Sequence, residues 1–324
     1  MGAGTAAQRL YRVIRPWKMN KEETSLTNLR EFLHMGMRKE AEALGFCSDA
    51  RRGTEIDEEE ENVLGFLGLD QDDPDLPPQP KPVQPQMDPN TPDQILSDIT
   101  CMGIPLKIAH SPQKGLSFQV WPACLSLCRF TDLLLRHVSP PPPPRAPLAP
   151  LLTPAFAEIF HHPTEELPPY GPAAATLLAG RHILELGAGT GLLGVALAKH
   201  GARVVITDLP KTLPVLERNI AMNGIAYPGP ERAEAPDCPG WARAMAIDWF
   251  APPALEAVSA RPLDLIIASD CIYDLALHGP LIDTLVALSG PETEVLLGNM
   301  KRWNSVEGKF WKKIQKHFAI TADV

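Results

Sequence analysis

After Gly180 the sequence alternates between short, almost wholly apolar segments and longer amphipathic ones. The apolar segments are predicted to be strands, and they cover residues 182–187, 203–208, 243–248, 263–269 and 294–299. Helices are predicted to begin near Gly191, Leu213 and Leu281. Continuous apolar strands separated by helices are typical of a parallel sheet with helices on both faces. This part of the chain therefore predicts an α/β, doubly wound fold.

A glycine-rich loop joins the first predicted strand to the first predicted helix. The segment GAGTGLLG, residues 187–194, has Gly189, Gly191 and Gly194 at the spacing of the dinucleotide fingerprint. Any Rossmann-like protein can bring backbone N–H groups close to a ligand at such a loop. A purely structural turn can have the same spacing. The glycines alone therefore do not identify the ligand.

Two acidic residues narrow the choice of ligand. Asp208 ends the second strand, where its carboxylate can accept hydrogen bonds from both hydroxyls of a ribose. Glu185 lies two residues before Gly187, and a carboxylate just beneath the loop would repel a pyrophosphate. The same carboxylate would attract the ammonium of a methionine moiety. The pair favours a cationic nucleoside cofactor over a dinucleotide.

These motifs resemble the family 16 protein methyltransferases. The resemblance depends on E-x-G-x-G-x-G at residues 185–191, D-x-x-Y at residues 270–273, Trp121 and Trp249. The family consists of class I, seven-strand enzymes that use S-adenosyl-L-methionine, and it includes lysine methyltransferases for chaperones and AAA ATPases. The resemblance covers residues 95–320. It implies a Rossmann-like, mostly parallel sheet of the class I methyltransferase type.

The resemblance implies a role for individual residues. The cofactor-binding residues that it implies are Trp121, Glu185, Gly187, Gly189, Gly191, Asp208, Leu209, Trp249 and Ser269. Within that set, Glu185 would face the methionine end, Asp208 the ribose and Trp249 the adenine. Asp270 and Tyr273 would be the catalytic pair at the substrate nitrogen, where the in-line reaction demands alignment of a neutral amine with the methyl group. For the two tryptophans and Tyr273, ordinary packing is the alternative.

The implied reaction is methylation of a lysine side chain in a protein substrate, such as a chaperone or ATPase, by a monomer. Cys271 and Ile272 replace both prolines of the Asn/Asp-Pro-Pro-Tyr motif of amide and nucleobase N-methyltransferases, which argues against those acceptors. Two other functions stay open. The first is methylation of a small metabolite or of another protein residue. The second is an interaction protein that binds the cofactor without activity.

The ending of the chain gives an expectation about the sheet. The family's sheet normally has two strands after the last helix, predicted here at residues 305–318. Only residues 319–324 follow that helix. We therefore expect six strands in the main sheet, with the edge of segment 294–299 unpaired or paired with residues 319–324. A missing strand favours the inactive alternative.

Composition and apolar spacing, together with the extent of the resemblance, divide the chain into three parts. Residues 1–48 form an N-terminal extension with one amphipathic helix at 24–44, and residues 49–94 are an acidic and then proline-rich linker predicted to be disordered. The methyltransferase domain comprises residues 95–324. It begins with a predicted β-hairpin around Gly103, followed by a helix with Pro122 near its first turn.

Two proline-rich insertions interrupt this domain, at residues 139–172 and 225–242. The prolines at the start of the first insertion predict an exposed polyproline loop, with a ligand for a proline-reading module as the alternative.

Composition excludes several classes of partner. The net charge of −9 disfavours binding to nucleic acid or to an anionic membrane. The six cysteines have neither zinc-site spacing nor the context of a secreted disulfide framework, so no metal is expected. The sequence has no membrane-spanning run or secretory signal, which predicts a cytoplasmic or nuclear protein. The first twenty residues contain arginine and no acid, so import into an organelle stays open.

Overall fold

The computed structural model describes most of the chain after residue 90 and two short segments before it. The described residues are 8–13, 86–88, 91–139, 142–143, 145–161, 167–171, 176–235, 237–299 and 304–323. Residues 112–116 belong to a second compact unit, and all other described residues belong to the first. The predicted helix at 24–44 lies outside the described residues. In the described part of the chain, no helix is both long and apolar enough to cross a membrane.

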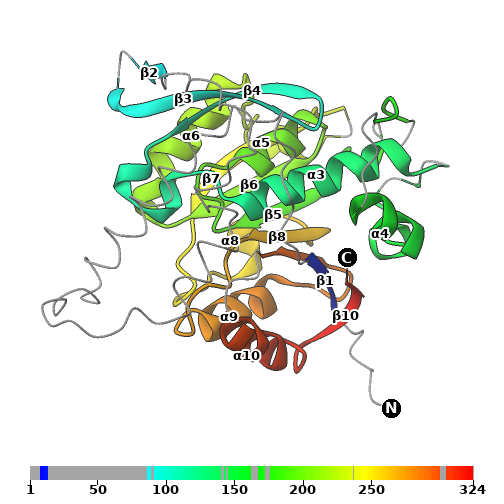
Figure 1. Ribbon diagram of the computed structural model, residues 1–324. Helices are drawn as coiled ribbons and strands as arrows, with labels where there is room; N and C mark the ends of the chain where they lie inside the picture. The colour runs from blue at the N-terminus through cyan, green and yellow to red at the C-terminus, as the bar shows by residue number, and fades with distance from the viewer. Residues whose placement is uncertain are drawn as a thin grey trace, which may run out of the picture. The chain divides into compact units, whose positions relative to one another are not determined.

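A seven-stranded sheet forms the centre of the first unit (Figure 1). Its strands in spatial order are β10 (Phe318–Asp323), β1 (Gln8–Val13), β9 (Glu294–Gly298), β8 (Leu265–Ser269), β5 (His182–Leu186), β6 (Arg203–Asp208) and β7 (Trp241–Ala246). All of these pairings are parallel. Strands β5, β6, β8 and β9 are buried along their whole length, which explains their continuous apolar sequences. The predicted doubly wound α/β fold is confirmed.

The expected six-stranded sheet is wrong. Strand β1, from the N-terminal extension, lies between β9 and β10 and pairs with both: Leu10 is opposite Val295 on one side and Ile320 on the other. The edge of β9 is therefore paired, but with β1 and not with residues 319–324. The expectation failed because β1 is remote in sequence from both of its partners. The sequence of a short strand does not show which strand of a sheet it will pair with. The inactive alternative loses its main structural argument.

A smaller antiparallel sheet contains β2 (Gln86–Asp88), β3 (Thr91–Cys101) and β4 (Ile104–His110) (Figure 1). Strand β2 and the start of β3 lie inside the segment assigned to the linker, so strands begin earlier than residue 95. The predicted hairpin around Gly103 is present, and its two turn residues, Met102 and Gly103, both have positive φ angles, of 49° and 71°. Two such residues form the turn type that matches the twist of a hairpin.

Helices cover both faces of the main sheet. The longer ones are α3 (Pro122–His137), α4 (Pro154–His161), α5 (Leu192–Lys199), α6 (Leu213–Met222), α9 (His278–Leu288) and α10 (Asn304–Ile314). Among the described residues, the shorter helices are α7 (Pro230–Ala233), α8 (Leu255–Val258) and 3-10 turns at 116–118, 149–151 and 210–212. A further 3-10 turn at 112–114 belongs to the second unit. As expected, Pro122 is in the first turn of α3.

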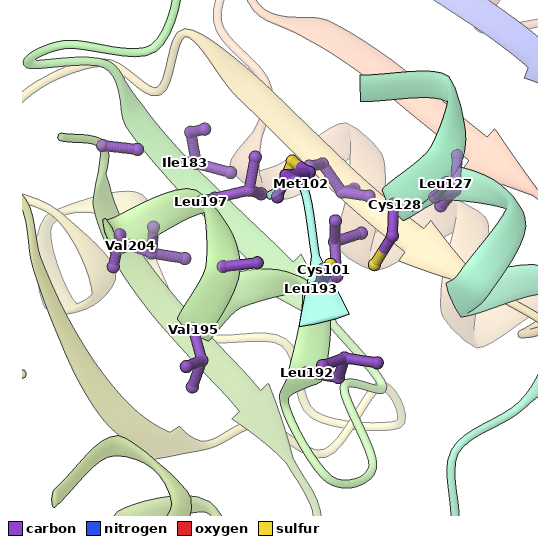
Figure 2. Close-up of a cluster of buried hydrophobic side chains, with 14 of the residues drawn as sticks. Cys101, Met102, Leu127, Cys128, Ile183, Leu192, Leu193, Val195, Leu197 and Val204 are labelled. Atoms are coloured by element: carbon purple, nitrogen blue, oxygen red, sulfur yellow. The ribbon is translucent and has the colours of Figure 1, made fainter. Parts of the chain in front are cut away.

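Alternate apolar residues of β5, β6, β8 and β9 enter two different cores. Ile183 of β5 belongs to a cluster with Leu197 of α5 and Cys128 of α3, shown in Figure 2. The next residue, Leu184, belongs to a second cluster with Phe310 of α10. Figure 1 accordingly shows α3 and α5 on one side of the sheet and α9 and α10 on the other. The two cores hold the carboxyl ends of the strands at one rigid edge.

Asn219 of α6 and Asn223, the residue just after this helix, pair with the free edge of β4. Asn219 Oδ1 accepts the Ala109 N–H at 2.7 Å, and Asn219 Nδ2 donates to the Ala109 carbonyl at 3.0 Å and to the Thr190 carbonyl at 2.8 Å. One helical turn later, Asn223 makes the same pair of hydrogen bonds with Lys107, at 3.0 and 2.8 Å. A helical turn and two residues of a strand have similar lengths, so the amides match alternate strand residues. Asn219 thereby joins the hairpin to the glycine loop.

We predict that Asn219→Ala lowers the free energy of unfolding by about 2–4 kcal/mol, because it leaves three buried backbone groups without partners. Asn223→Ala is the matched control. Its hydrogen bonds with Lys107 are exposed, so water can replace the amide and the loss should be about 1 kcal/mol or less. Denaturant unfolding of both variants measures the difference, and equal losses would contradict the role assigned to Asn219.

Candidate functional site

All the predicted site residues except Trp121 lie at the carboxyl ends of strands of the main sheet or in the segments that follow them. Strands β8, β5, β6 and β7 are consecutive neighbours and parallel, so the segments that follow them emerge side by side. These segments are residues 187–191 after β5, 209–212 after β6, 247–254 after β7 and 270–277 after β8. Ligands of open α/β sheets bind at this edge.

The glycine loop passes too close to its neighbours to tolerate side chains. Gly187 has a φ of 60°, and a Cβ there would lie 2.7 Å from Cys271 Sγ and 3.1 Å from the Trp249 ring. Gly191 has a φ of 74° and begins α5, with room for no Cβ beside Leu216. Positive φ angles and close approach both require glycine. The loop is thus a backbone-lined surface at the start of a helix.

Glu185 is completely buried beneath this loop. Its Oε2 accepts a hydrogen bond from the Gly194 N–H at 2.9 Å, whereas its Oε1 is buried with no hydrogen-bond partner. Burial raises the pKa of Glu185 from 4.5 to about 8; the Gly194 hydrogen bond opposes this rise, and the charge of Asp208 adds to it. An unpaired buried acceptor of this kind is costly unless a ligand satisfies it.

Asp208 lies at the end of β6 and is also buried. Its carboxylate accepts hydrogen bonds from the Gly189 N–H at 2.8 Å, the Leu209 N–H at 2.8 Å and the Thr212 hydroxyl at 3.0 Å. Burial raises its pKa in spite of these donors. The Ser117 side chain gives this carboxylate a fourth donor, so a ligand hydroxyl would have to replace one of the four. The ribose role of Asp208 stays a prediction.

Asp270 follows β8 in a strained conformation. Its φ is 59°, in the left-handed region that non-glycine residues rarely adopt, and its N–H donates to the Gly298 carbonyl at 2.7 Å. Such strain is concentrated at functional sites. Its neighbour Ser269 is buried, whereas Tyr273 is 40% exposed.

Cys271 is the point on which the acidic residues converge. Its buried thiol lies under Gly187, and burial, followed by the negative charges of Asp208, Asp270 and Glu185, raises its pKa well above the usual value. The three acids therefore lie near one another, as expected from the sequence, and their roles in a site stay predictions. Among the described residues, no group of three or more His, Cys, Asp or Glu side chains is arranged to hold a metal ion.

The two predicted tryptophans differ in their position. The ring of Trp249 lies against Gly187, as the short distance to a Cβ at that position shows. Trp121 is the N-cap residue of α3, and its carbonyl accepts the Cys124 N–H at 3.0 Å. The segment just before Trp121 reaches the loop directly: the carbonyl of Ser117 lies 3.3 Å from a Cβ built on Gly189.

Gln119 is not among the residues predicted from the sequence, although it lies beside the loop. Its side chain is 1% exposed, and neither its amide nitrogen nor its amide oxygen has a hydrogen-bond partner. Its backbone carbonyl lies 3.5 Å from a Cβ built on Gly189, so the residue is part of the segment that covers the loop. Proximity to Trp121 in the sequence was the only available signal. Asn219, which positions Thr190, carried no signal at all.

The raised pKa of Glu185 predicts a pH dependence of stability. The folded chain keeps a proton that the unfolded chain releases, so this contribution to stability is fully present below about pH 4.5 and is lost as the pH rises through about 8. The loss is at most about 1.4 kcal/mol for each pH unit. Glu185→Gln, which cannot ionise, should show a smaller fall in melting temperature over this range.

Thermal unfolding of the ligand-free chain at several pH values measures this difference. Asp283→Asn, an exposed change on α9, is the control and should follow the wild type. If Glu185→Gln and the wild type have the same pH slope, Glu185 is ionised in the folded chain, and its assignment as a buried neutral acid fails.

Comparisons with known proteins identify the family to which the chain belongs. Residues 102–317 match the family model described as lysine methyltransferase. The protein-lysine N-methyltransferase EFM6 of Saccharomyces cerevisiae is 28% identical over 43% of this chain and 57% of its own length. The EEF1A lysine methyltransferase 3 of Mus musculus is 31% identical over 44% and 55%, and the calmodulin-lysine N-methyltransferase of Arabidopsis thaliana is 31% identical over 44% and 45%.

This chain thus spans about half the length of the curated relatives that it matches. The family match is more extensive. It includes the hairpin turn, α3, the glycine loop and the segments after β6, β7 and β8. The chain belongs to the lysine methyltransferase family.

Proposed function

We propose that this chain is an S-adenosyl-L-methionine-dependent methyltransferase that transfers a methyl group to a lysine side chain of a protein substrate. The observation that carries the proposal is the convergence of Glu185, Asp208 and Asp270 on the glycine loop, around Cys271. Three acids at a loop that also offers backbone N–H groups suit a ligand with both cationic and hydrogen-bonding parts. The negative charges of Asp208 and Asp270 oppose a dinucleotide, whose pyrophosphate is anionic, and a cationic ligand would favour ionisation of Glu185 as well.

The described residues fit this cofactor in two respects. Glu185 Oε1 is a buried acceptor without a partner, suited to the ammonium of the methionine moiety, directly or through a water molecule. The loop surface at Gly187 and Gly189 is free of side chains, so a ligand can approach the backbone. Trp249, against Gly187, would border the adenine, and Asp208 would hold the ribose. When bound, the cofactor supplies an electrophilic methyl group on a sulfonium.

The chain's contribution to the reaction is to prepare and align the acceptor nitrogen. Free lysine has a pKa near 10.4, so the ammonium must release a proton to water before its nitrogen can attack. Asp270 accepts hydrogen bonds from the amine and orients its lone pair, while the exposed ring of Tyr273 lines the entry. The strained backbone of Asp270 fixes this carboxylate at the end of β8.

The relatives support a protein acceptor, because their names concern lysine in proteins, EEF1A and calmodulin among them. A chaperone or ATPase as the substrate, a monomeric enzyme, and a cytoplasmic or nuclear location complete the proposal. The first test is incubation of a cell lysate with the chain and labelled cofactor, followed by mass spectrometry of the labelled bands. Modified lysine in a protein supports the proposal. Tight binding of NAD without binding of S-adenosylmethionine would overturn it.

Binding and catalysis should separate in two variants. Asp270→Asn keeps the shape of the side chain and removes its charge, so methyl transfer should fall steeply, by about 100-fold or more, with little change in cofactor affinity. Asp208→Ala should weaken cofactor binding by about 1–3 kcal/mol, because hydrogen bonds to a charged acceptor are lost. Calorimetry and a transfer assay measure the two effects. Unchanged turnover by Asp270→Asn would show that Asp270 is a structural residue.

A further inference from the structure

Large apolar side chains are exposed at the same edge of the sheet as the site. Among the described residues, four of the most exposed are Leu209 at 41%, Phe250 at 67%, Tyr273 at 40% and Leu275 at 45%. Each lies in a segment that follows the carboxyl end of β6, β7 or β8. We call these four residues the apolar rim. Exposed apolar groups that gather at a functional edge are typical of a binding surface.

The rim residues lie on both sides of the glycine loop. In the sheet, β5 has β8 on one side and β6 and then β7 on the other, so the loop after β5 is flanked by the segments that carry the rim. Trp249 and Cys271 both approach Gly187, which brings the segments of Phe250 and Tyr273 together at that point. The Thr284 hydroxyl donates to the Trp249 carbonyl at 3.3 Å and ties the Phe250 segment to α9.

The three segments that carry the apolar rim have a net negative charge. Segments 209–212, 247–254 and 270–277 contain Asp248, Asp270 and Asp274, and one basic residue, Lys211. Asp248 and Asp274 are exposed, and each is oriented by a hydrogen bond from a nearby backbone N–H, that of Phe250 at 3.0 Å and that of Ala276 at 2.8 Å. An acidic surface favours a basic partner and repels nucleic acid, anionic lipid and a second copy of itself.

We propose that the apolar rim is the docking surface for the segment that carries the target lysine, and that it selects a net basic segment with a large apolar side chain close to that lysine. The proposal rests on the proposed function and specifies its substrate. Phe250 and Leu275 bury apolar surface against the partner, and Asp248 and Asp274 attract its basic residues. Aromatic residues that become buried in an interface often contribute much of its affinity.

The experiment measures binding of three fluorescent peptides to the full chain by anisotropy. All have the same length and a central lysine. The first is basic with leucine and phenylalanine beside the lysine, the second has serine at those two places, and the third keeps the apolar pair with acidic flanks. The first peptide should bind about tenfold or more tightly than the other two, a difference of about 1.4 kcal/mol. Equal binding of the three would overturn the proposal.

Variants locate the binding surface. Phe250→Ser and Leu275→Ser should each weaken binding of the first peptide, and Asp248→Asn and Asp274→Asn should make it less sensitive to salt. The matched controls are Val286→Ser, which changes an apolar side chain on α9 that is 37% exposed, and Asp283→Asn, an exposed acid on the same helix. If the four rim and acid variants change the affinity for the first peptide, or its salt dependence, no more than the two controls do, the proposal is overturned.

A transfer assay separates this proposal from the proposed function. If Phe250→Ser and Leu275→Ser methylate lysate proteins with unchanged kcat/KM, the docking assignment fails and the methyltransferase assignment stands. If the peptide preference is observed but no methyl transfer occurs, the rim is a binding surface, and the proposed reaction fails. Far-UV circular dichroism and cofactor affinity should be the same for the variants and the wild type, because none of the four changes touches the glycine loop.

Discussion

The close approach of the glycine loop to the segments after β7 and β8 is the constraint on which the rest of the site depends. Gly187 lies where a Cβ would collide with Cys271 and with Trp249. Because the loop has no side chain there, the ends of β5, β7 and β8 come together, and the acids of the site share one small region. A side chain at Gly187 would separate these segments before it blocked any ligand.

Burying acidic side chains beneath the glycine loop lowers the stability of the folded chain. Glu185 has no counter-ion in its described surroundings, and its pKa of about 8 shows how strongly the site opposes its ionised form. Asp270 adds a strained backbone. Such features persist only where the surrounding structure holds them in place, and here two hydrophobic cores and the Asn219 hydrogen bonds do so. We interpret the site as destabilised without its cofactor and relieved by a cationic ligand.

The same edge of the sheet joins the two proposals. The buried acids near Gly187 account for a cationic cofactor, and the exposed residues around them account for the acceptor. Phe250 immediately follows Trp249, and Asp274 lies four residues after Asp270. Short segments thus carry a buried residue for one ligand and an exposed residue for the other. One segment can serve both ligands because neighbouring side chains in a loop can point in opposite directions, one toward the interior and one toward solvent.

The sequence by itself determined the fold class, the bounds of β6, the hairpin turn at Gly103 and the start of α3 at Pro122, because apolar periodicity and backbone restrictions are local properties. It also brought Glu185, Asp208 and Asp270 to one edge, since parallel strands carry their carboxyl ends together. Only the tertiary structure decided the place of β1, the contact of Cys271 with Gly187, the burial of Gln119 and the link from Asn219 to Thr190. Each of these depends on contacts between segments distant in sequence, which local patterns do not encode.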